Sequence, residues 1–599
     1  MFKMIIQLFS LLTPKQVNQF YTLQLLVVLM AFTEILGIAS IAPFMALVGD
    51  MSLLEREGAI AKIYQYSGVN DPTQFLFYTG FAVLIMLAIS TVISMYTTWK
   101  LSLYAANTGT EISDRLYRYY MQKDWLFHAG SSSAYLTKQV ASEAVRLTDS
   151  VIQPLLHMNA KVVLAFFLSI SILIYNPLIA LSGLLIFAFA YIFLYKLVRK
   201  QLKVNGDNLS VISTERFRLM NEGFGGIKDV LLLNRHHDFV ERFQDSGKDF
   251  AYARGTNNAI SQVPRYFMEL VAFGTMIGLV LLLIKLHQGD LGAVLPILAV
   301  YALAAFKLLP ALQQIYSSIT QIKGNASAFE AIKEDLAQSL DNKQAMFDEN
   351  INEQLSFKKN IALTNIDFTY PGKSNLAISS LDMVIPVNSV IGLVGSSGSG
   401  KSTTIDLLLG LLTPDAGEIY IDNTCMTAMN KRAWQNTIGF VPQSIFLSEG
   451  TIAENVAFGL AKKDINLEQV KKALQLANMI ELVQDLPNGV NTKVGERGVQ
   501  LSGGQRQRIG IARALYNEAD VLVFDEATSA LDGITERIIM ESIHNLSGKK
   551  TIIMIAHRLK TVQKCDIIYM MDKGKVIAQG SYQDLIKNNI TFKEMAEHS

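Results

Sequence analysis

Six stretches of apolar residues fill the first half of this 599-residue chain and limit its possible folds more than any other feature. They cover residues 20–47, 75–96, 151–175, 178–197, 266–286 and 291–319. A helix of about 20 residues crosses the hydrocarbon core of a bilayer, so each stretch is long enough to span a membrane. Half of all residues are hydrophobic (50%), which is too many for one soluble domain of this length. The sequence therefore predicts a membrane domain of six helices.

Lysine and arginine indicate how this domain is oriented. They gather in the connections after the second and fourth stretches, whereas the connections at 175–177 and 287–290 are short and carry little charge. Because positive residues stay in the cytoplasm, the N-terminus and the second half of the chain are expected there. Residues 1–12 are apolar and weakly basic and lead into no signal-peptide cleavage site, so we expect an interfacial helix on the cytosolic leaflet.

A glycine-rich loop in the second half predicts a phosphate-binding site. It reads Gly395-Ser396-Ser397-Gly398-Ser399-Gly400-Lys401-Ser402, between the apolar run 390–394 and a helix-like segment that begins at Thr403. Glycines allow backbone N–H groups to surround an anion, the lysine reaches the outer phosphates, and the serine hydroxyl can bind Mg²⁺. A nucleoside triphosphate is the expected ligand.

Two carboxylates follow a second apolar strand at residues 521–524. In phosphoryl transfer, the first acid, Asp525, would hold Mg²⁺, and Glu526 would polarise the attacking water. The alternative is that both acids only end the strand. That alternative is weak when the strand is considered together with the phosphate loop.

Between these two motifs lies Leu501-Ser502-Gly503-Gly504-Gln505, where the chain resembles ATP-binding cassette (ABC) proteins. The resemblance extends, in family order, through Tyr370, Gln443, residues 494–498, residues 529–532 and His557. It implies that Tyr370 stacks on adenine, that Gln443 senses Mg²⁺, that Glu526 is the general base and that His557 contacts the γ-phosphate. The implied nucleotide-binding residues are Tyr370, Gly395, Ser396, Gly398, Gly400, Lys401, Ser402, Thr403, Ser502, Gly503, Gly504, Gln505 and Asp532; the implied Mg²⁺ ligands are Ser402, Gln443 and Asp525.

In this family the serine and glycines of the signature segment close on ATP held by the opposite subunit. A helix N-terminus with exposed N–H groups suits a terminal phosphate. The chain carries one cassette, so the resemblance implies a homodimer with two ATP sites. The acid and the histidine that inactive cassettes lose are both present at Glu526 and His557.

Six spans before one cassette resemble an ABC exporter half-transporter. The resemblance implies an all-α membrane domain of the type I exporter fold, followed by an α/β P-loop domain, in a bacterial inner membrane. We expect the membrane domain at residues 1–332, a polar linker at 333–355 and the cassette at 356–599. Helices extended past the bilayer would carry coupling segments at 124–129 and 226–234 to the cassette, although ordinary loops are the alternative for these two segments.

Charged residues within the spans are candidates for cargo binding, because an ionised side chain in hydrocarbon is costly unless it faces protein or water. Glu34, Lys161, Glu269 and Lys307 lie within spans, and Arg265 stands at the entry of the fifth. Glu34, Arg265 and Lys307 are the candidates to contact an anionic headgroup. The alternatives are a structural ion pair between Glu34 and Lys161, and snorkelling of both cations to the interface.

Residues 32–44 and 263–269 are similar to segments of lipid-linked oligosaccharide flippases of the PglK type, although Lys307 stands where an arginine is expected. That similarity implies a polyprenyl-diphosphate glycan as cargo and a short external helix within residues 51–66. A peptide or bacteriocin exporter and a lipid A or multidrug exporter are the alternatives. A formal net charge of +1 gives no reason to expect a nucleic-acid partner. Cys425 and Cys565 are expected to be reduced thiols that serve as packing residues.

Overall fold

The computed structural model describes residues 2–49, 51–55, 58–175, 177–286, 291–341, 353–495, 498, 500–526, 533–544, 546–556 and 559–597. The chain divides into two compact units. One comprises residues 1–123 and 127–344, and the other comprises residues 124–126 and 345–599.

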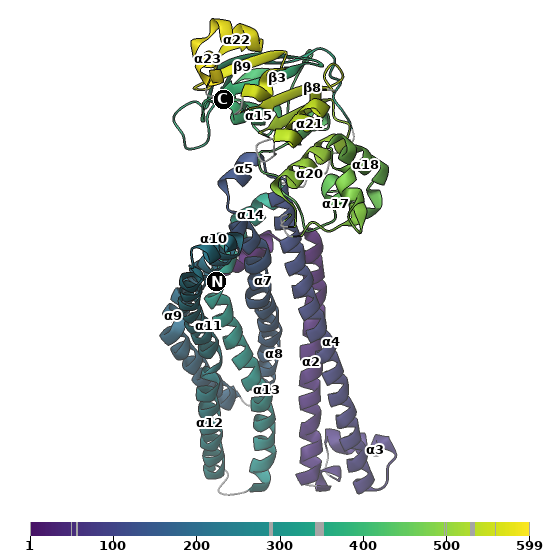
Figure 1. Cartoon of the computed structure of the whole chain (residues 1–599). Helices are drawn as coiled ribbons and strands as arrows, with labels where there is room; N and C mark the ends of the chain where they lie inside the picture. Colours follow the sequence, from purple (N-terminus) through teal and green to yellow (C-terminus); the bar gives the residue numbers. More distant parts are fainter. Residues whose placement is uncertain are drawn as a thin grey trace. The chain divides into compact units, whose positions relative to one another are not determined.

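The first unit is helical (Figure 1). Its elements are α1 (Phe2–Ser10), α2 (Pro14–Gly49), the 3₁₀ turn η1 (Met51–Leu54), α3 (Ala59–Ser67), α4 (Pro72–Met121), α5 (Trp125–Gly130), α6 (Ser133–Lys138), the π-helical turn η2 (Gln139–Glu143), α7 (Ala144–Leu147), the π-helical turn η3 (Thr148–Ile152), α8 (Gln153–Tyr175), α9 (Pro177–Gly225), α10 (Ile227–Leu232), α11 (His236–Gln262), α12 (Pro264–Leu286), α13 (Leu291–Gly324) and α14 (Ala326–Asp341). Helix α2 packs along α4, α13 along α8, and α11 along α9.

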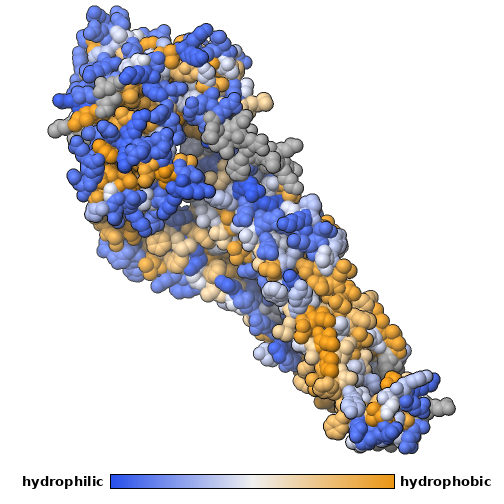
Figure 2. Space-filling model, turned by 90° about the vertical axis from the view of Figure 1, so that its right-hand side faces the viewer, coloured by the Kyte–Doolittle hydropathy of each residue, from blue (hydrophilic) through white to orange (hydrophobic). Residues whose placement is uncertain are grey.

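Among the residues that the structure describes, five helical segments of this unit are long and apolar enough to cross a membrane. They are residues Pro14–Gly49, Pro72–Met121, Ser133–Ile174, Ala180–Gly225 and His236–Leu282. Each overlaps one of the first five predicted spans, and the sixth predicted span lies within helix α13. Figure 2 shows hydrophobic residues gathered in a band over the helical unit, with hydrophilic residues at its far end.

The helices continue well past the predicted spans. Helix α4 runs without interruption to Met121, because no proline or glycine pair interrupts it between Tyr96 and that residue. Fully buried side chains of α4 and α14 pack together in one apolar cluster, including Ile112, Leu116, Phe329 and Leu336. Helix α14 therefore occupies the first nine residues of the predicted linker, residues 333–341.

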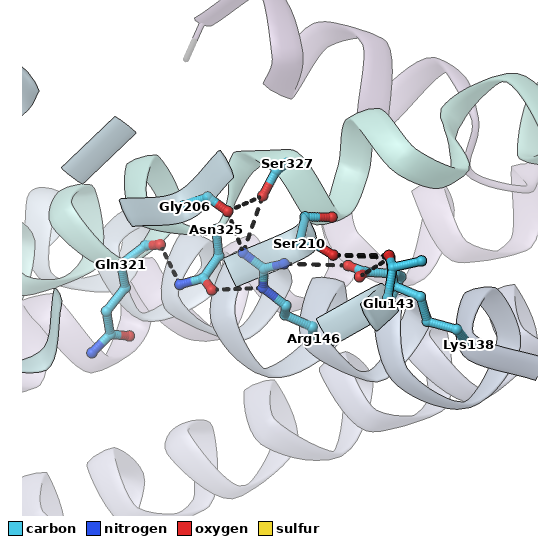
Figure 3. A network of polar contacts seen from close by, with 9 residues as sticks. Lys138, Glu143, Arg146, Gly206, Ser210, Gln321, Asn325 and Ser327 are labelled. Atoms are coloured by element: carbon cyan, nitrogen blue, oxygen red, sulfur yellow. Dashed lines mark hydrogen bonds and ion pairs between the residues drawn. The ribbon is translucent and has the colours of Figure 1, made fainter. Parts of the chain in front are cut away.

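A buried ion network joins three of these helical extensions (Figure 3). Glu143 is fully buried and lies 3.1 Å from the Lys138 ammonium and 3.4 Å from the Arg146 guanidinium. Lys138 also donates to the carbonyl oxygen of Ser210 on α9, and Arg146 donates to the side chain of Asn325, just after α13. The network links the π-helical region to α9 and to the α13–α14 junction.

Two glycines explain how close these helices approach. A Cβ atom at Gly109 of α4 would lie 1.9 Å from the Thr148 hydroxyl, and one at Gly206 of α9 would lie 2.5 Å from the Gly324 carbonyl oxygen. Larger side chains would therefore force the helices apart, which accounts for glycine at both positions.

The second unit is an α/β domain. Its strands are β1 (Asn360–Phe368), β2 (Ile378–Pro386), β3 (Val390–Gly395), β4 (Ala416–Ile421), β5 (Thr424–Cys425), β6 (Ile438–Val441), β7 (Val521–Asp525), β8 (Thr551–Ile555), β9 (Ile567–Asp572) and β10 (Lys575–Gly580). Its helices are α15 (Lys401–Leu408), α16 (Lys431–Gln435), α17 (Ile452–Val456), α18 (Leu467–Leu476), α19 (Ile480–Gln484), α20 (Gly503–Tyr516), α21 (Gly533–His544), α22 (Tyr582–Asn588) and α23 (Ile590–Glu597), with 3₁₀ turns at Lys462–Asp464, Gly489–Asn491 and Leu559–Val562.

Two sheets form the core of this domain. The larger has the strand order β10-β9-β3-β8-β7-β6 and is parallel except for β10, and the smaller is antiparallel with the order β2-β1-β4-β5. Strands β3, β7 and β8 consist almost entirely of buried apolar residues, as expected for a parallel sheet covered on both faces. Cys565 is buried in this core, and its burial raises the pKa of the thiol to about 12.

The carboxyl ends of the central strands meet at one edge of the larger sheet. Leu393 of β3 and Asp525 of β7 both pair with Ile555 of β8. The loops after these three strands therefore emerge together, and ligands of open parallel sheets bind at this edge.

Candidate active site

The loop after β3 is shaped by glycines that adopt positive φ angles. Gly398 has φ 79° and Gly400 has φ 103°, conformations that other residues rarely adopt. A Cβ atom at Gly400 would lie 2.9 Å from Ile378 and 3.2 Å from the Ala377 carbonyl oxygen, and one at Gly395 would lie 2.2 Å from the Met571 carbonyl oxygen. The loop is thus held against β2 and β9, and helix α15 begins directly after it.

Lys401 lies inside this loop. It is only 6% exposed, and its ammonium donates to the carbonyl oxygens of Gly395 and Ser396, both at 2.8 Å. Burial lowers the pKa of Lys401, and the carboxylates of Glu526 and Asp525 partly oppose that shift. The lysine is therefore positioned on the phosphate side of the loop, next to the two predicted acids.

A cavity of about 720 Å³ opens over the loop. The predicted residues among its described lining are Tyr370, Gly398, Gly400, Lys401, Ser402, Thr403, Gln443 and Glu526. Tyr370 stands at the end of β1, its ring packs edge-to-face on Phe368, and its hydroxyl lies 3.1 Å from the Thr403 hydroxyl. The sequence motifs that seemed separate along the chain thus share one cavity.

Glu526 and Gln443 contact each other next to the carboxyl end of strand β7. The side-chain amide of Gln443 donates to the Glu526 carboxylate at 2.7 Å. Glu526 has φ 49°, a left-handed conformation that costs energy for a residue with a side chain and that is concentrated at functional sites. Asp525, one residue earlier, ends β7.

Asp406 on α15 adds a third carboxylate to this region. Burial, followed by the negative charge of Asp525, raises the pKa of Asp406 to about 6. The sequence analysis did not single out this residue, because an aspartate within an amphipathic helix reads as a surface residue.

The signature segment forms the start of helix α20. Ser502 is its N-cap and accepts a hydrogen bond from the Gln505 backbone, while the Gln505 side chain accepts one from the Ser502 backbone N–H. Gly503 and Gly504 form the first turn of the helix. The described lining of the cavity over the phosphate loop contains none of Ser502, Gly503, Gly504 and Gln505.

Helix α20 is nevertheless tied to the segment after Gln443. Arg513 donates to the carbonyl oxygens of Phe446 and Asn455, both at 2.9 Å, and its guanidinium lies 4.6 Å from the centre of the Phe458 ring. Burial lowers the pKa of this guanidinium. Arg513 therefore connects the signature helix directly to the segment that follows Gln443.

Two predicted residues, Asp532 and His557, lie outside the residues that the structure describes. Strand β8 ends at Ile555, two positions before His557, at the same sheet edge as the phosphate loop.

Lys573 lines the cavity but was missed by the sequence analysis. It lies in the turn between β9 and β10, where Lys573 has φ 46° and Gly574 has φ 78°. The Gly574 backbone N–H donates to the Ser399 carbonyl oxygen at 2.9 Å, so this turn is fastened to the phosphate loop. The Asp-Lys-Gly sequence indicates a tight hairpin turn, but nothing in it shows where the hairpin lies.

Two ion pairs form among the charged residues of the predicted membrane spans. The Lys307 ammonium lies 3.4 Å from Glu34, whose other carboxylate oxygen accepts a hydrogen bond from the Ser94 hydroxyl at 2.9 Å. Glu34 thus forms a structural ion pair with Lys307, and not with Lys161 as the alternative had it. Arg265 pairs with Glu269 one helical turn away at 2.7 Å. The Lys307 side chain remains 42% exposed and that of Arg265 65% exposed, so both can still reach a ligand.

Comparisons with known proteins agree with this arrangement. The sequence profile of the ABC transporter transmembrane region matches residues 41–306, and the ABC transporter profile matches residues 378–529. An ATP-dependent lipid A-core flippase of Cupriavidus pinatubonensis is 29% identical over 66% of this chain and 66% of its own length. The leukotoxin translocation ATP-binding protein LktB of a Pasteurella haemolytica-like species is 41% identical over 38% of this chain and 32% of its own length.

A solved structure of a bacterial Atm1-family ABC exporter with ATP bound has the same fold. It superposes with a TM-score of 0.77 at 21% sequence identity, covering 97% of this chain and 98% of that one. The chain spans about two thirds or less of the length of the two curated relatives named above.

A helical membrane domain joined to a P-loop domain with a signature helix is the domain arrangement of the ABC transporters. The chain belongs to the ABC transporters and has the domain order of an exporter-type half-transporter, with a type I exporter fold. An ATP-binding domain of this family implies ATP hydrolysis coupled to transport.

Proposed function

We propose that two copies of this chain form an exporter in a bacterial inner membrane, with the N-terminus and the cassettes in the cytoplasm. Its cargo is an amphipathic lipid with an anionic headgroup, and a polyprenyl-diphosphate-linked oligosaccharide is the first candidate. The observation that carries the choice of cargo is the half-exposed Lys307 beside the buried Glu34, within helices that cross the membrane.

The cassette residues suit ATP hydrolysis. Tyr370 stacks on adenine, the glycine loop donates backbone N–H groups to the phosphates, and Lys401 exchanges its carbonyl partners for phosphate oxygens. Glu526, held by Gln443, accepts the proton of the attacking water. His557 contacts the γ-phosphate from the loop after β8.

The same residues fit a magnesium ion. Ser402, Gln443 and Asp525 supply a hydroxyl, an amide oxygen and a carboxylate, which are the hard oxygen donors that Mg²⁺ prefers. Ser402 and Gln443 line the cavity, and Asp525 lies one residue before Glu526, which also lines it. When bound, such an ion would supply positive charge next to the phosphate oxygens.

The position of the signature helix supports a homodimer. Ser502 presents a capped helix N-terminus, which suits a phosphate, yet it does not line the described cavity over the phosphate loop of its own chain. We infer that Ser502 to Gln505 close on the nucleotide of the partner subunit, so that each ATP site contains Lys401 of one chain and Ser502 of the other.

Lys307 and Arg265 support the choice of cargo. A cation in a membrane span is costly, and each of these two has a carboxylate partner that lowers the cost while leaving the side chain exposed. A phosphate or diphosphate headgroup can take the place of either carboxylate. Such a headgroup cannot cross hydrocarbon unaided, because its desolvation is far costlier than thermal energy.

The relatives keep two other cargoes open. Lipid A-core has the same chemistry, an anionic saccharide headgroup on apolar chains, and the flippase relative is named for it. The LktB relative is named for a protein toxin, but the match covers 38% of this chain. We therefore rank a peptide third.

A translocation assay tests the proposal. Purified protein is reconstituted in vesicles that contain, in parallel, a polyprenyl-diphosphate glycan, lipid A-core and a fluorescent peptide. We expect ATP-dependent flipping of a glycolipid, and none by Glu526→Gln. Transport of the peptide alone would contradict the proposal.

The headgroup contacts are tested by stimulation of ATP hydrolysis. Lys307→Ala and Arg265→Ala should raise the glycolipid concentration for half-maximal stimulation about tenfold each, the loss expected for a charged hydrogen bond. Lys307→Arg should retain the response. Arg218→Ala is the matched control, because Arg218 forms a similar exposed pair with Glu215 at 2.7 Å. Equal responses in all four variants would remove Lys307 and Arg265 from the cargo site.

A further inference from the structure

A second cavity, of about 620 Å³, lies among helices α8, α9, α12 and α13 of the helical unit. Its lining is mainly apolar and includes Phe187 of α9 and Leu308 and Leu312 of α13. The polar side chains in the lining are those of Ser169, Ser182, Thr275 and Tyr301. The residues of α13 that line it recur every three or four positions, so they form one face of that helix. The cavity is separate from Lys307 and Arg265, neither of which is part of its described lining.

Three glycines on the cavity wall keep this space open. Gly183, Gly274 and Gly278 lie in helices α9 and α12, where glycine costs about 1 kcal/mol relative to alanine. At Gly109 and Gly206 a closely packed neighbour explains the glycine. A Cβ atom at Gly183, Gly274 or Gly278, in contrast, would have no neighbouring atom within 4 Å. No steric requirement of a neighbour explains these glycines. Their effect is to enlarge the cavity.

Two tyrosines continue the same helix faces beyond the cavity. Tyr191 follows Phe187 by one turn of α9, and Tyr316 follows Leu312 by one turn of α13. Their ring centres lie 5.5 Å apart, and Tyr316 is only 5% exposed. Neither hydroxyl has a hydrogen-bond partner among the described residues. A buried hydroxyl without a partner costs about 1–3 kcal/mol, so both are suited to donate to a ligand oxygen.

We propose that this cavity holds a hydrocarbon chain of the transported lipid, with the tyrosine pair donating hydrogen bonds to an ester or phosphate oxygen at the polar end of that chain. The inference rests on the proposed function and adds to it a site for the lipid chain. The cavity lies between membrane-spanning helices, where lipid chains are the abundant apolar ligands, and water does not fill an apolar cavity stably. An apolar chamber followed by unpaired hydroxyls fits an amphipathic molecule better than a wholly apolar one.

Photolabelling tests this directly. The full-length protein is placed in phosphatidylethanolamine–phosphatidylglycerol vesicles that contain phosphatidylglycerol with a diazirine in one acyl chain. We expect the label in cavity-lining peptides of α9, α12 and α13, and competition by the glycolipid that the protein flips. The double variant Gly274→Leu/Gly278→Leu should reduce labelling at least tenfold and abolish glycolipid flipping, because leucine fills the cavity without meeting a neighbouring atom at its Cβ.

Gly255→Leu is the matched control. Gly255 is also a helical glycine with no atom within 4 Å of its Cβ position, but it lies in α11 and outside the described cavity lining. It should leave labelling and flipping unchanged, and all glycine variants should keep their basal ATP hydrolysis. Tyr191→Phe/Tyr316→Phe preserves the volume and should raise the lipid concentration for half-maximal labelling about 3- to 10-fold.

Two outcomes separate this inference from the proposed function. Labelling spread evenly over the helices, and unchanged by Gly274→Leu/Gly278→Leu in a protein that still flips glycolipid, would overturn the cavity site and leave the proposed function standing. Labelling within the cavity of a wild-type protein that flips none of the lipids would overturn the proposed function, and with it the assignment of the bound chain to cargo.

Discussion

In the proposed function, single side chains of the cassette determine whether ATP is cleaved or only bound. Glu526 has a strained backbone and a carboxylate fixed by Gln443, and Lys401 lies within the loop itself. Both features orient charged groups before the substrate arrives, which is how preorganised sites lower a barrier.

Replacing Glu526 by glutamine should separate binding from hydrolysis. The variant keeps its shape but cannot accept a proton, and general bases contribute about 10²- to 10⁴-fold. We expect hydrolysis to fall at least 100-fold while ATP binding is retained. Phosphate release and equilibrium binding of a fluorescent ATP analogue measure the two properties. A rate close to that of the wild type would show that another group is the base.

Asp406 should make the stability of the nucleotide-free protein depend on pH. Its pKa is about 6 in the folded state, above its ordinary value near 4, so the folded state holds the proton more tightly and stability falls as pH rises from about 4 to 6. The pKa shift sets an upper limit of about 3 kcal/mol on the loss of folding stability. The actual loss should be smaller, because the carboxyl is only partly buried and solvent screens its charge.

Asp406→Asn should remove this dependence and raise the thermal midpoint at pH 7.5. Melting curves in detergent between pH 4.5 and 7.5 measure it, with Asp464→Asn on the exposed surface as the control. A variant that loses stability with pH as steeply as the wild type would contradict the assignment.

The residues of the nucleotide site were predictable because fixed short spacings carry them. The glycine loop, the Asp525–Glu526 pair and the Ser502 segment are each contiguous, and the parallel sheet brings the strand ends that carry the first two together. Lys573 and the Glu34–Lys307 pair were not predictable. Positions 34 and 307 are 273 residues apart, and neither local pattern nor composition specifies which charges meet across such a distance.

Helices of the membrane unit are held together outside the spans by polar contacts as well as by apolar packing. Glu143 serves two cations at once, and the segment around it contains two π-helical turns, η2 and η3. Such turns are rare in proteins, and those that occur are often found at functional sites. The region joins the extensions of three spans through these paired charges.

Glu143→Ala should be strongly destabilising, since it removes the carboxylate that pairs with the buried Lys138 and the partly buried Arg146. We expect a loss of about 3–5 kcal/mol, seen as a lower thermal midpoint. Glu215→Ala is the matched control, because Glu215 pairs with Arg218 at the surface and such pairs contribute about 0–1 kcal/mol. Equal shifts for the two variants would show that the buried network does not stabilise the fold.

The elements were predicted well where hydropathy changes sharply and poorly where it does not. Five predicted spans coincide with apolar helices, but α4 continues to Met121 and α14 occupies residues 333–341 of the predicted linker. Polar residues on a helical extension look like linker residues, and only the packing of Phe329 and Leu336 shows that α14 belongs to the core. The π-helical turns have no sequence signature.

At the scale of the whole molecule, the proposed active site requires two chains. In the proposed dimer, each site combines the phosphate loop of one chain with the signature helix of the other. A mutation in the phosphate loop of one chain and a mutation in the signature helix of its partner should therefore leave one of the two sites intact.

Complementation tests this arrangement. Chains with Lys401→Ala and chains with Ser502→Arg should each be inactive as homodimers. A mixed dimer contains one site with intact Lys401 from the second chain and intact Ser502 from the first, so differently tagged mixed dimers should recover ATP hydrolysis. A dimer of chains that both carry the two substitutions should not. Inactivity of the mixed dimer would contradict shared sites, as would activity of a single isolated chain.

The burial of Cys565 has a practical consequence for spectroscopy. The chain has two cysteines, both in the cassette, and the Cys565 thiol is shielded and remains protonated at neutral pH. Replacing Cys425 alone therefore yields a nearly unreactive background. Maleimide dyes or spin labels can then be attached at single chosen positions of the helical unit, so that distances can be followed through the ATP cycle without rebuilding the cassette core.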